Sequence, residues 1–101
     1  MIRAEFYGSS GKLTGFKMSG HAGLAESGKD VACAAVSSAV QLIVNLLDEF
    51  GCEPDVNVGE DVIICKASGD NAGKLLYRLK QHFEAIVEEF PGTIKITISE
   101  V

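Results

Sequence analysis

Apolar and polar residues alternate near the N-terminus with the two-residue period of a half-buried β-strand. Ile2, Ala4 and Phe6 form the apolar set. The segment GSSGK that follows predicts a turn. Residues 13–19 then predict a second strand that pairs back on the first, with Thr14, Phe16 and Met18 on one face.

The next apolar segment has a helical period. We expect a helix from Val31 to Phe50, capped by the Asp30 carboxylate and ended by Gly51. Its apolar residues form one stripe of Val36, Val40, Ile43, Leu47 and Phe50, and a second of Ala35, Ala39, Leu42 and Leu46. A helix that is apolar on two sides has to be covered on two sides. The sheet can cover one stripe, and a second helix or a second copy of the protein must cover the other, so we expect a homodimer.

The second half of the chain repeats the strand and helix patterns. Residues 54–58 and 61–67 predict a hairpin that turns at Gly59–Glu60. A second helix is expected to begin with Asp70 or Asn71 as its cap and to end before Pro91. Its apolar stripe consists of Ala72, Leu76, Leu79, Phe83, Ile86 and Phe90. The C-terminal segment TIKITISEV alternates as a last strand, with Ile94, Ile96 and Ile98 facing inward.

The predicted order of elements is therefore ββαββαβ. We expect an α+β fold, a two-layer sandwich in which a mostly antiparallel five-stranded sheet carries both helices on one face. The chain has 101 residues, of which 47% are hydrophobic. This is the size of one ordinary domain, so residues 1–101 are expected to share one core.

Composition and charge exclude several kinds of protein. Nine basic against 14 acidic residues give a net charge of −5, and an acidic domain repels phosphate backbones, so no direct nucleic-acid binding is expected. The three cysteines are an odd number without a CxxC pair, which argues against disulfides and zinc. We expect no metal and no cofactor. The N-terminus does not have the apolar run of a signal peptide, so a cytoplasmic location is expected. Polar residues interrupt the most apolar window, Val31 to Leu47, so no membrane contact is expected.

Cys33 is the first candidate for chemistry. With Asp30 as the cap, Cys33 would be the third residue of the helix, where free N–H groups and the helix dipole favour a thiolate. A free thiol has a pKa of about 8.5, so mostly ionising it near neutral pH requires a shift worth about 2.7 kcal/mol. A helix end supplies only about 0.3–1 kcal/mol. A nearby cation is therefore needed if Cys33 is a nucleophile. The alternative interpretation is a small buried hydrophobic residue.

His21 is the candidate partner of Cys33. It follows Gly20 at the end of the second predicted strand, and a strand–loop–helix connection can bring it to the first turn of the helix. A nucleophile within reach of a base is the general arrangement of covalent catalysis. Lys29 is a competing cation, but a lysine cannot readily return a proton to a leaving group near neutral pH. Taken alone, His21 favours the interpretation of a solvated loop histidine, and it is the combination with Cys33 that indicates a base.

Further polar residues near Cys33 are candidates for supporting roles. Ser37 lies one helical turn after Cys33 and could donate a hydrogen bond to the thiolate or to a substrate carbonyl, or it could bond to its own backbone. Asp30 could orient His21 instead of capping the helix. Cys52 and Cys65 are expected to be packing residues. His82 is expected to be a partly buried surface histidine at the edge of the apolar stripe of the second helix.

Two motifs in this order, GHAG followed by CAAVSS, resemble the ribosomal-processing cysteine protease family. The resemblance covers the chain in length and in the order of its elements. It implies that His21 is the general base and Cys33 the nucleophile, with Asp30 and Ser37 at supporting positions. It also implies a homodimer whose substrate is the N-terminal extension of a large-subunit ribosomal protein. The sequence departs from the family in the segment DVAC, because alanine precedes the cysteine at a position where the family often has a bulkier residue.

These observations predict a cysteine endopeptidase in which Cys33 attacks the scissile carbonyl and His21 transfers the proton. Two other interpretations use the same residues differently. One is a thiol redox-sensing domain built on Cys33, although the chain has no CxxC pair. The other is a non-catalytic ribosome-assembly or scaffolding dimer. The glycine-rich segment from Gly20 to Lys29 is expected to order over a bound peptide, because little apolar surface anchors it in the free protein.

Overall fold

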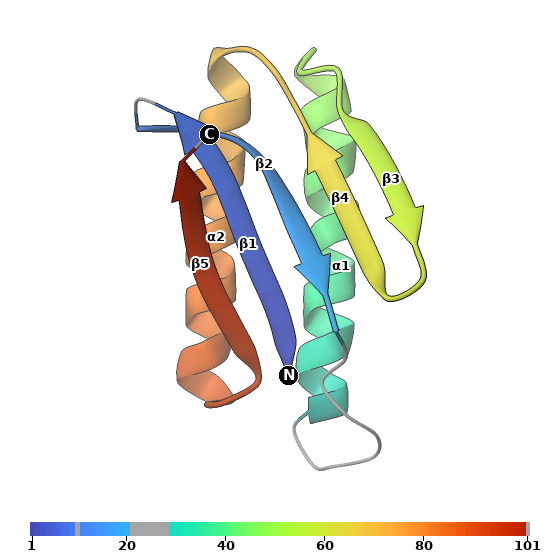
Figure 1. Cartoon of the computed structure of the whole chain (residues 1–101), viewed down its shortest axis with the longest axis vertical. Helices are drawn as coiled ribbons and strands as arrows, with labels where there is room; N and C mark the ends of the chain where they lie inside the picture. Colours follow the sequence, from blue (N-terminus) through green and yellow to red (C-terminus); the bar gives the residue numbers. More distant parts are fainter. Residues whose placement is uncertain (10, 21–28, 101) are drawn as a thin grey trace.

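A computed structural model of the chain describes residues 1–9, 11–20 and 29–100. The order of elements is ββαββαβ, as predicted (Figure 1). The elements are β1 (Ile2–Ser9), β2 (Lys12–Ser19), α1 (Lys29–Glu49), β3 (Asp55–Gly59), β4 (Val62–Lys66), α2 (Asp70–Glu89) and β5 (Ile94–Glu100).

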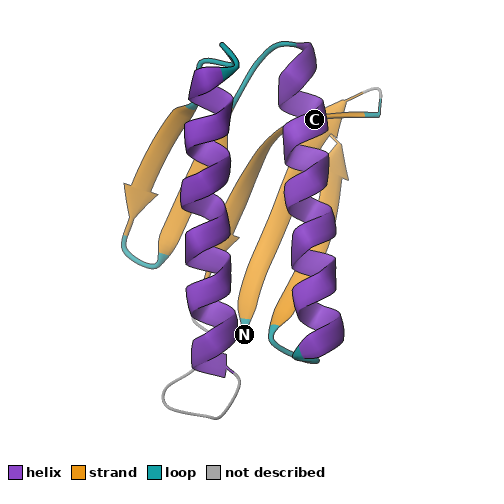
Figure 2. Cartoon of the chain, turned by 180° about the vertical axis from the view of Figure 1, so that it is seen from behind, coloured by secondary structure: helices purple, strands orange, loops and turns teal. Residues whose placement is uncertain are grey.

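The five strands form one sheet in the order β3-β4-β2-β1-β5. All neighbouring strands are antiparallel except β1 and β5, which are parallel. β4 runs in the same direction as β1, and α2 returns the chain from the end of β4 to the start of β5, so β5 takes that direction too. Both helices lie on one face of the sheet, and the other face carries no helix (Figures 1 and 2). The predicted two-layer α+β sandwich is confirmed.

The pairing of β1 with β2 contains a bulge that the sequence pattern does not reveal. Tyr7 pairs with Gly15 but Gly8 pairs with Leu13, which leaves Thr14 as the extra residue. Thr14 is exposed, so its expected position beside the buried Phe16 and Met18 is wrong. One extra residue reverses the alternation of side chains, and that accounts for the error.

The core lies between the sheet and the helices. The Phe6 ring packs against the rings of Phe16 and Phe83, with centroids 6.3 and 6.0 Å away. The first stripe of α1 and the stripe of α2 are buried here, with two exceptions at the helix ends: Phe50 is 53% exposed, and Phe90 is half-buried. The prediction for Phe50 is wrong because α1 ends at Glu49, before Phe50 reaches the core.

Edge strand β5 also differs from the expectation. Ile98 pairs with Phe6 and so lies on the helix side of the sheet, as predicted, but its side chain is 58% exposed. Ile94 is buried and Ile96 half-buried. The helices cover the beginning of this edge strand more fully than its end, so alternation correctly predicts the face of Ile98 but not its burial.

The ends of two other elements are shifted from their predicted positions. The N-cap of α2 is Gly69, which has a φ of 96° and makes no side-chain cap hydrogen bond. Asp70 is the first helical residue, so the predicted Asp70 or Asn71 cap is wrong. Instead, the Asp70 carboxylate lies 3.7 Å from the Lys12 ammonium. The turn between β3 and β4 is formed by Glu60 and Asp61, one residue later than expected.

By length and composition alone, the segment Val31–Glu49 of α1 is apolar enough to cross a membrane, with a mean hydropathy of 1.7. Its stripe from Val36 to Leu47 is buried in the core of the protein. Since 28% of the apolar window is buried, core packing accounts for this stripe but not for exposed residues such as Val31 and Leu42.

Candidate active site

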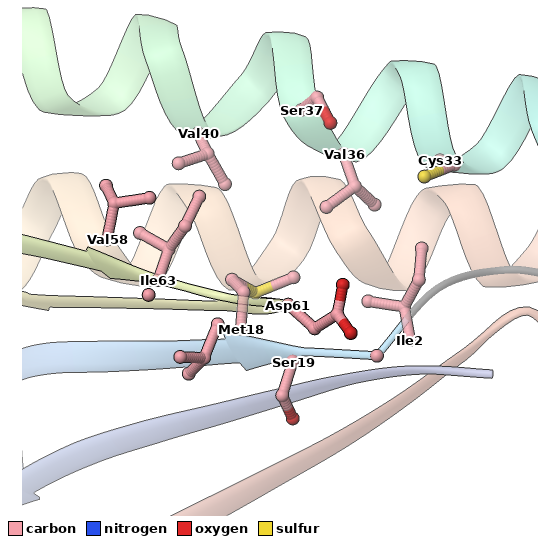
Figure 3. Close-up of a pocket in the computed structure, with 13 residues that line it drawn as sticks. Ile2, Met18, Ser19, Cys33, Val36, Ser37, Val40, Val58, Asp61 and Ile63 are labelled. Carbon is pink, nitrogen blue, oxygen red and sulfur yellow. The ribbon is translucent and has the colours of Figure 1, made fainter.

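Cys33 lines a cavity of about 270 Å³ between α1 and the sheet. Figure 3 shows Cys33 and Ser37 on the α1 side of this cavity and Met18 and Asp61 on the sheet side. The remaining lining comes from Ser19, Gly20 and Gly59 and from the aliphatic residues Ile2, Val36, Val40, Val58, Val62 and Ile63. A half-buried thiol at such a cavity can reach a bound peptide, whereas a thiol in the core cannot.

The position of Cys33 in the helix differs from the prediction. Because α1 begins at Lys29, Asp30 is the second helical residue, not the N-cap, and Cys33 is the fifth residue, not the third. The influence of the helix dipole decreases within the first turn, and the free N–H groups belong to that turn. The helix therefore activates the Cys33 thiol less than predicted, and a separate base is needed even more.

The end of β2 is tied to the turn between β3 and β4. The Gly20 N–H donates to the Asp61 carbonyl oxygen over 3.2 Å, and both residues line the cavity with Cys33. Gly20 has a φ of 79°, and a Cβ atom there would lie 2.7 Å from the Met1 carbonyl oxygen. Glycine is thus required at this position both by the backbone conformation and by the close approach of the N-terminus.

Ser37 lines the same cavity as Cys33, as their spacing of one helical turn predicts. Its side chain is exposed. Within the described part of the chain the Ser37 hydroxyl makes no hydrogen bond, so the alternative of a serine bonded to its own backbone is not observed. The hydroxyl is positioned to donate to a group bound in the cavity.

His21 follows Gly20 directly but lies outside the described residues. The pairing of His21 with Cys33 therefore stays a prediction, as does the ordering of the segment from Gly20 to Lys29. The side chains of Lys29 and Asp30 also lie outside the description, so the supporting role of Asp30 stays a prediction. What the structure does place is Gly20, at the cavity that Cys33 lines.

The other two cysteines are packing residues, as expected. Cys52 and Cys65 are both buried in the core. Burial raises the pKa of the Cys65 thiol, and the Asp55 carboxylate raises it further. Neither residue lines the cavity of Cys33. His82 is exposed on α2, at a groove between the helices.

Asp61, like Ser19, is a polar cavity residue that the sequence pattern did not single out. It has a φ of 61°, in the left-handed region, and its carboxylate is drawn toward the cavity in Figure 3. The pairing of β4 with β2 carries this turn to the end of β2. A two-residue turn between short strands gives no sign of that proximity in the sequence.

Comparison with known proteins shows the family of this chain. The family model for cysteine protease Prp matches residues 1–95. The chain belongs to the cysteine protease Prp family. A curated member, the ribosomal processing cysteine protease Prp of Bacillus subtilis (strain 168), is 41% identical over 63 residues. That match spans 60% of this chain and 56% of the length of the relative.

Solved structures of Prp proteins share the fold. The Prp of S. aureus with a covalently linked product peptide has a TM-score of 0.86 at 25% identity, and the match covers 98% of this chain and all of the other. The S. aureus Prp with a substrate peptide gives the same TM-score at 24% identity and the same coverage. A protein from Streptococcus mutans has a TM-score of 0.79 at 23% identity, covering 100% of this chain and 96% of the other.

Proposed function

We propose that this protein is a cysteine endopeptidase that removes the N-terminal extension of a large-subunit ribosomal protein in the cytoplasm. The observation that carries the proposal is the position of Cys33, whose thiol lines a cavity of about 270 Å³ together with Gly20, the residue before His21. Membership of the Prp family supports the activity, and the names of the B. subtilis and S. aureus Prp proteins support a ribosomal substrate.

In the proposed mechanism, His21 accepts the Cys33 proton while the sulfur attacks the scissile carbonyl carbon. The imidazolium then gives this proton to the amine of the departing peptide as the C–N bond breaks, leaving a thioester on Cys33. Water attacks the thioester carbonyl and loses a proton to His21. The C–S bond breaks, the carboxylic product leaves, and the sulfur recovers its proton. These steps use only the chain, the peptide and water.

The surroundings of Cys33 suit such a reaction. The free N–H groups of the first turn of α1 precede Cys33 and are candidates for stabilising the oxyanion, and the Ser37 hydroxyl is a further donor. The aliphatic lining of the cavity suits a large apolar side chain of the peptide, because burying apolar surface there gains about 25 cal/mol per Å².

A homodimer is part of the proposal. α2 covers the second stripe of α1 only in part: Ala35, Ala39 and Leu46 are half-buried, but Leu42 is 61% exposed. An apolar groove of about 650 Å³ runs between the helices beside Leu42. A second copy packed on this groove would bury the stripe that the monomer leaves in solvent.

The decisive experiment is to incubate the protein with N-terminal peptides of large-subunit ribosomal proteins and to read the products by mass spectrometry. Cleavage at one bond, lost in Cys33→Ala, is the expected result. Intact peptides with every candidate, from a correctly folded protein, would overturn the proposal.

A further inference from the structure

The face of the sheet that carries no helix has a charged hollow of its own. Arg3 on β1 is in register with Lys95 on β5 and with Ser19 on β2. In the next row, Glu5 is in register with Thr97 and Lys17. These residues alternate along their strands with the buried Ile2, Ala4, Phe16 and Met18, so they lie on the side away from the helices. Together the six line a hollow of about 290 Å³, which we call the basic sheet face.

The charge of the basic sheet face is opposite to that of the whole protein. The hollow holds three cations, Arg3, Lys17 and Lys95, and one carboxylate, Glu5, although the chain as a whole has a net charge of −5. Both oxygens of Glu5 are already engaged, because they accept hydrogen bonds from the Tyr7 hydroxyl at 2.8 Å and the Ser99 hydroxyl at 2.9 Å. These bonds keep Glu5 charged, so three cations and one carboxylate give the hollow a net charge of +2.

The arrangement of the cations is unfavourable in the free protein. Arg3 and Lys95 lie at directly adjacent positions of neighbouring strands, and like charges there destabilise a sheet. Among the described residues, no carboxylate lies within 4.0 Å of the charged nitrogens of Arg3, Lys17 or Lys95. A bound anion would remove this repulsion, and the Ser19 and Thr97 hydroxyls of the hollow could donate to its oxygens.

The composition of the face distinguishes between kinds of anionic partner. The core of a protein–protein interface is apolar, whereas a nucleic-acid interface is polar and positive. The exposed large hydrophobic residues of the strands lie on the other side of the sheet: Val56 and Val58 are in register with Cys65 and Ile63, and Ile98 with Phe6. The hollow itself is lined only by charged and hydroxyl side chains.

We propose that the basic sheet face is a docking surface for the phosphodiester backbone of RNA. The net charge of the chain argues against nucleic-acid binding, but the three cations and one carboxylate of this hollow give it a local net charge of +2, which attracts phosphate. Docking here leaves the Cys33 thiol accessible, because Cys33 belongs to α1, which lies on the other face of the sheet. The two hollows meet at Ser19, which lines both. A protease that acts on ribosomal proteins would thus bind RNA through this face while a protein tail enters the cavity of Cys33.

The test compares RNA binding by matched variants. One variant carries Arg3→Gln, Lys17→Gln and Lys95→Gln. Its control carries Lys12→Gln, Lys74→Gln and Arg78→Gln, which remove the same charge from exposed positions outside the hollow. Binding of a labelled oligouridine is measured by fluorescence anisotropy at about 50 to 200 mM KCl, and poly-glutamate serves as a competitor.

The native protein and the control should bind oligouridine, with a slope of log K against log salt of about −2, as expected for three contacts with a single strand. The Arg3, Lys17 and Lys95 variant should lose at least about tenfold in affinity while cleaving free peptide normally and unfolding at an equal or higher denaturant concentration. Equal losses in both variants, no binding by the native protein up to about 100 µM, or displacement by poly-glutamate as effective as by RNA would overturn the proposal.

The docking proposal takes its biological setting from the proposed protease function but can fail independently of it. If the native protein cleaves peptide but does not bind RNA, only the docking proposal fails. If it binds RNA but does not cleave peptide, only the proposed protease function fails.

Discussion

The backbone N–H of Gly20 donates to the carbonyl oxygen of Asp61 over 3.2 Å. This bond joins the residue that precedes His21 to the turn between β3 and β4. Both residues line the cavity that holds Cys33, so the chain enters the histidine-bearing segment at the cavity itself. The position of the candidate base therefore depends on strand pairing as well as on the motif that contains it.

Replacing Cys33 by alanine should abolish peptide cleavage, with a loss of about 10⁴-fold or more in kcat/KM, because the nucleophile is removed. Cys33 is half-buried, so the fold should stay intact. The measurement is a peptide-cleavage assay beside a urea unfolding curve.

The matched controls are Cys52→Ala and Cys65→Ala. Both thiols are buried outside the cavity, so these variants should keep their activity and lose about 1 kcal/mol of stability. Activity that survives in Cys33→Ala, or that is lost only in the two controls, would remove Cys33 from the mechanism.

Gly20→Ala tests whether catalysis depends on the backbone conformation of Gly20, the residue directly before His21. The left-handed conformation costs an alanine about 1–2 kcal/mol, and its Cβ would lie 2.7 Å from the Met1 carbonyl oxygen, so the chain has to shift there. We expect a large loss of kcat/KM.

The control for this prediction is Gly51→Ala. Gly51 also has a positive φ, 73°, but nothing lies within 4 Å of its added Cβ. This variant should lose stability without losing activity. Equal activity in the two variants would show that the position of Gly20 does not matter for catalysis.

His21→Ala should slow peptide cleavage by about 10²–10⁴-fold, the usual contribution of a general base. It should also slow the reaction of Cys33 with iodoacetamide near neutral pH, because the helix end alone activates a thiol too weakly. The informative measurement is the alkylation rate of Cys33 against pH in both proteins. Coincident profiles would mean that the two side chains form no ion pair in the resting enzyme, and normal cleavage would exclude His21 as the base.

The hydrogen bonds of Glu5 make a pH-dependent contribution to stability. The Tyr7 hydroxyl, the Ser99 hydroxyl and, more weakly, the Lys17 charge lower the pKa of Glu5 in the folded protein. A depressed carboxyl pKa stabilises the fold above the unfolded pKa of about 4.3, and this stabilisation is lost as the pH falls through the folded value.

Tyr7→Phe should therefore raise the pKa of Glu5, as followed by NMR titration of its carboxyl carbon. The variant should be less stable than the native protein at about pH 7, and the difference should shrink at about pH 3. Tyr77→Phe is the control, because Tyr77 lies on α2, away from Glu5. A constant difference across this range would mean that the hydroxyl does not act through the charge of Glu5.

The homodimer can be tested at the exposed position of the second stripe. Leu42→Glu should weaken dimerisation at least about tenfold, as expected for a buried anchor residue, while the monomer stays folded. Sedimentation at micromolar concentration measures the effect. Ile98→Glu is a matched control, since Ile98 is 58% exposed against 61% for Leu42 but lies on β5, outside the helix groove. A native protein that sediments as a monomer would show that the groove does not serve dimerisation.

Local patterns in the sequence were sufficient to predict the elements and, outside the bulge at Thr14, the faces of most of their residues. Alternation predicted the buried Ile2, Ala4 and Phe6, and the helical period predicted the stripe from Val36 to Leu47, because these periods follow directly from strand and helix geometry. The order ββαββαβ with a long apolar helix then left a two-layer α+β sandwich as the natural fold. The GHAG and CAAVSS motifs indicated the Prp family, which the family comparison confirmed.

Only the tertiary structure decided which residues meet. The bulge at Thr14, the exposure of Ile98 and the proximity of Asp61 to Gly20 all depend on pairings between strands that are distant in the chain or on the reach of a helix over the sheet. The same holds for Arg3, Lys17 and Lys95, which are spread along the sequence and gather on one face only because β1 lies between β2 and β5. Sequence periodicity records which face a residue occupies, whereas strand order and register determine its neighbours.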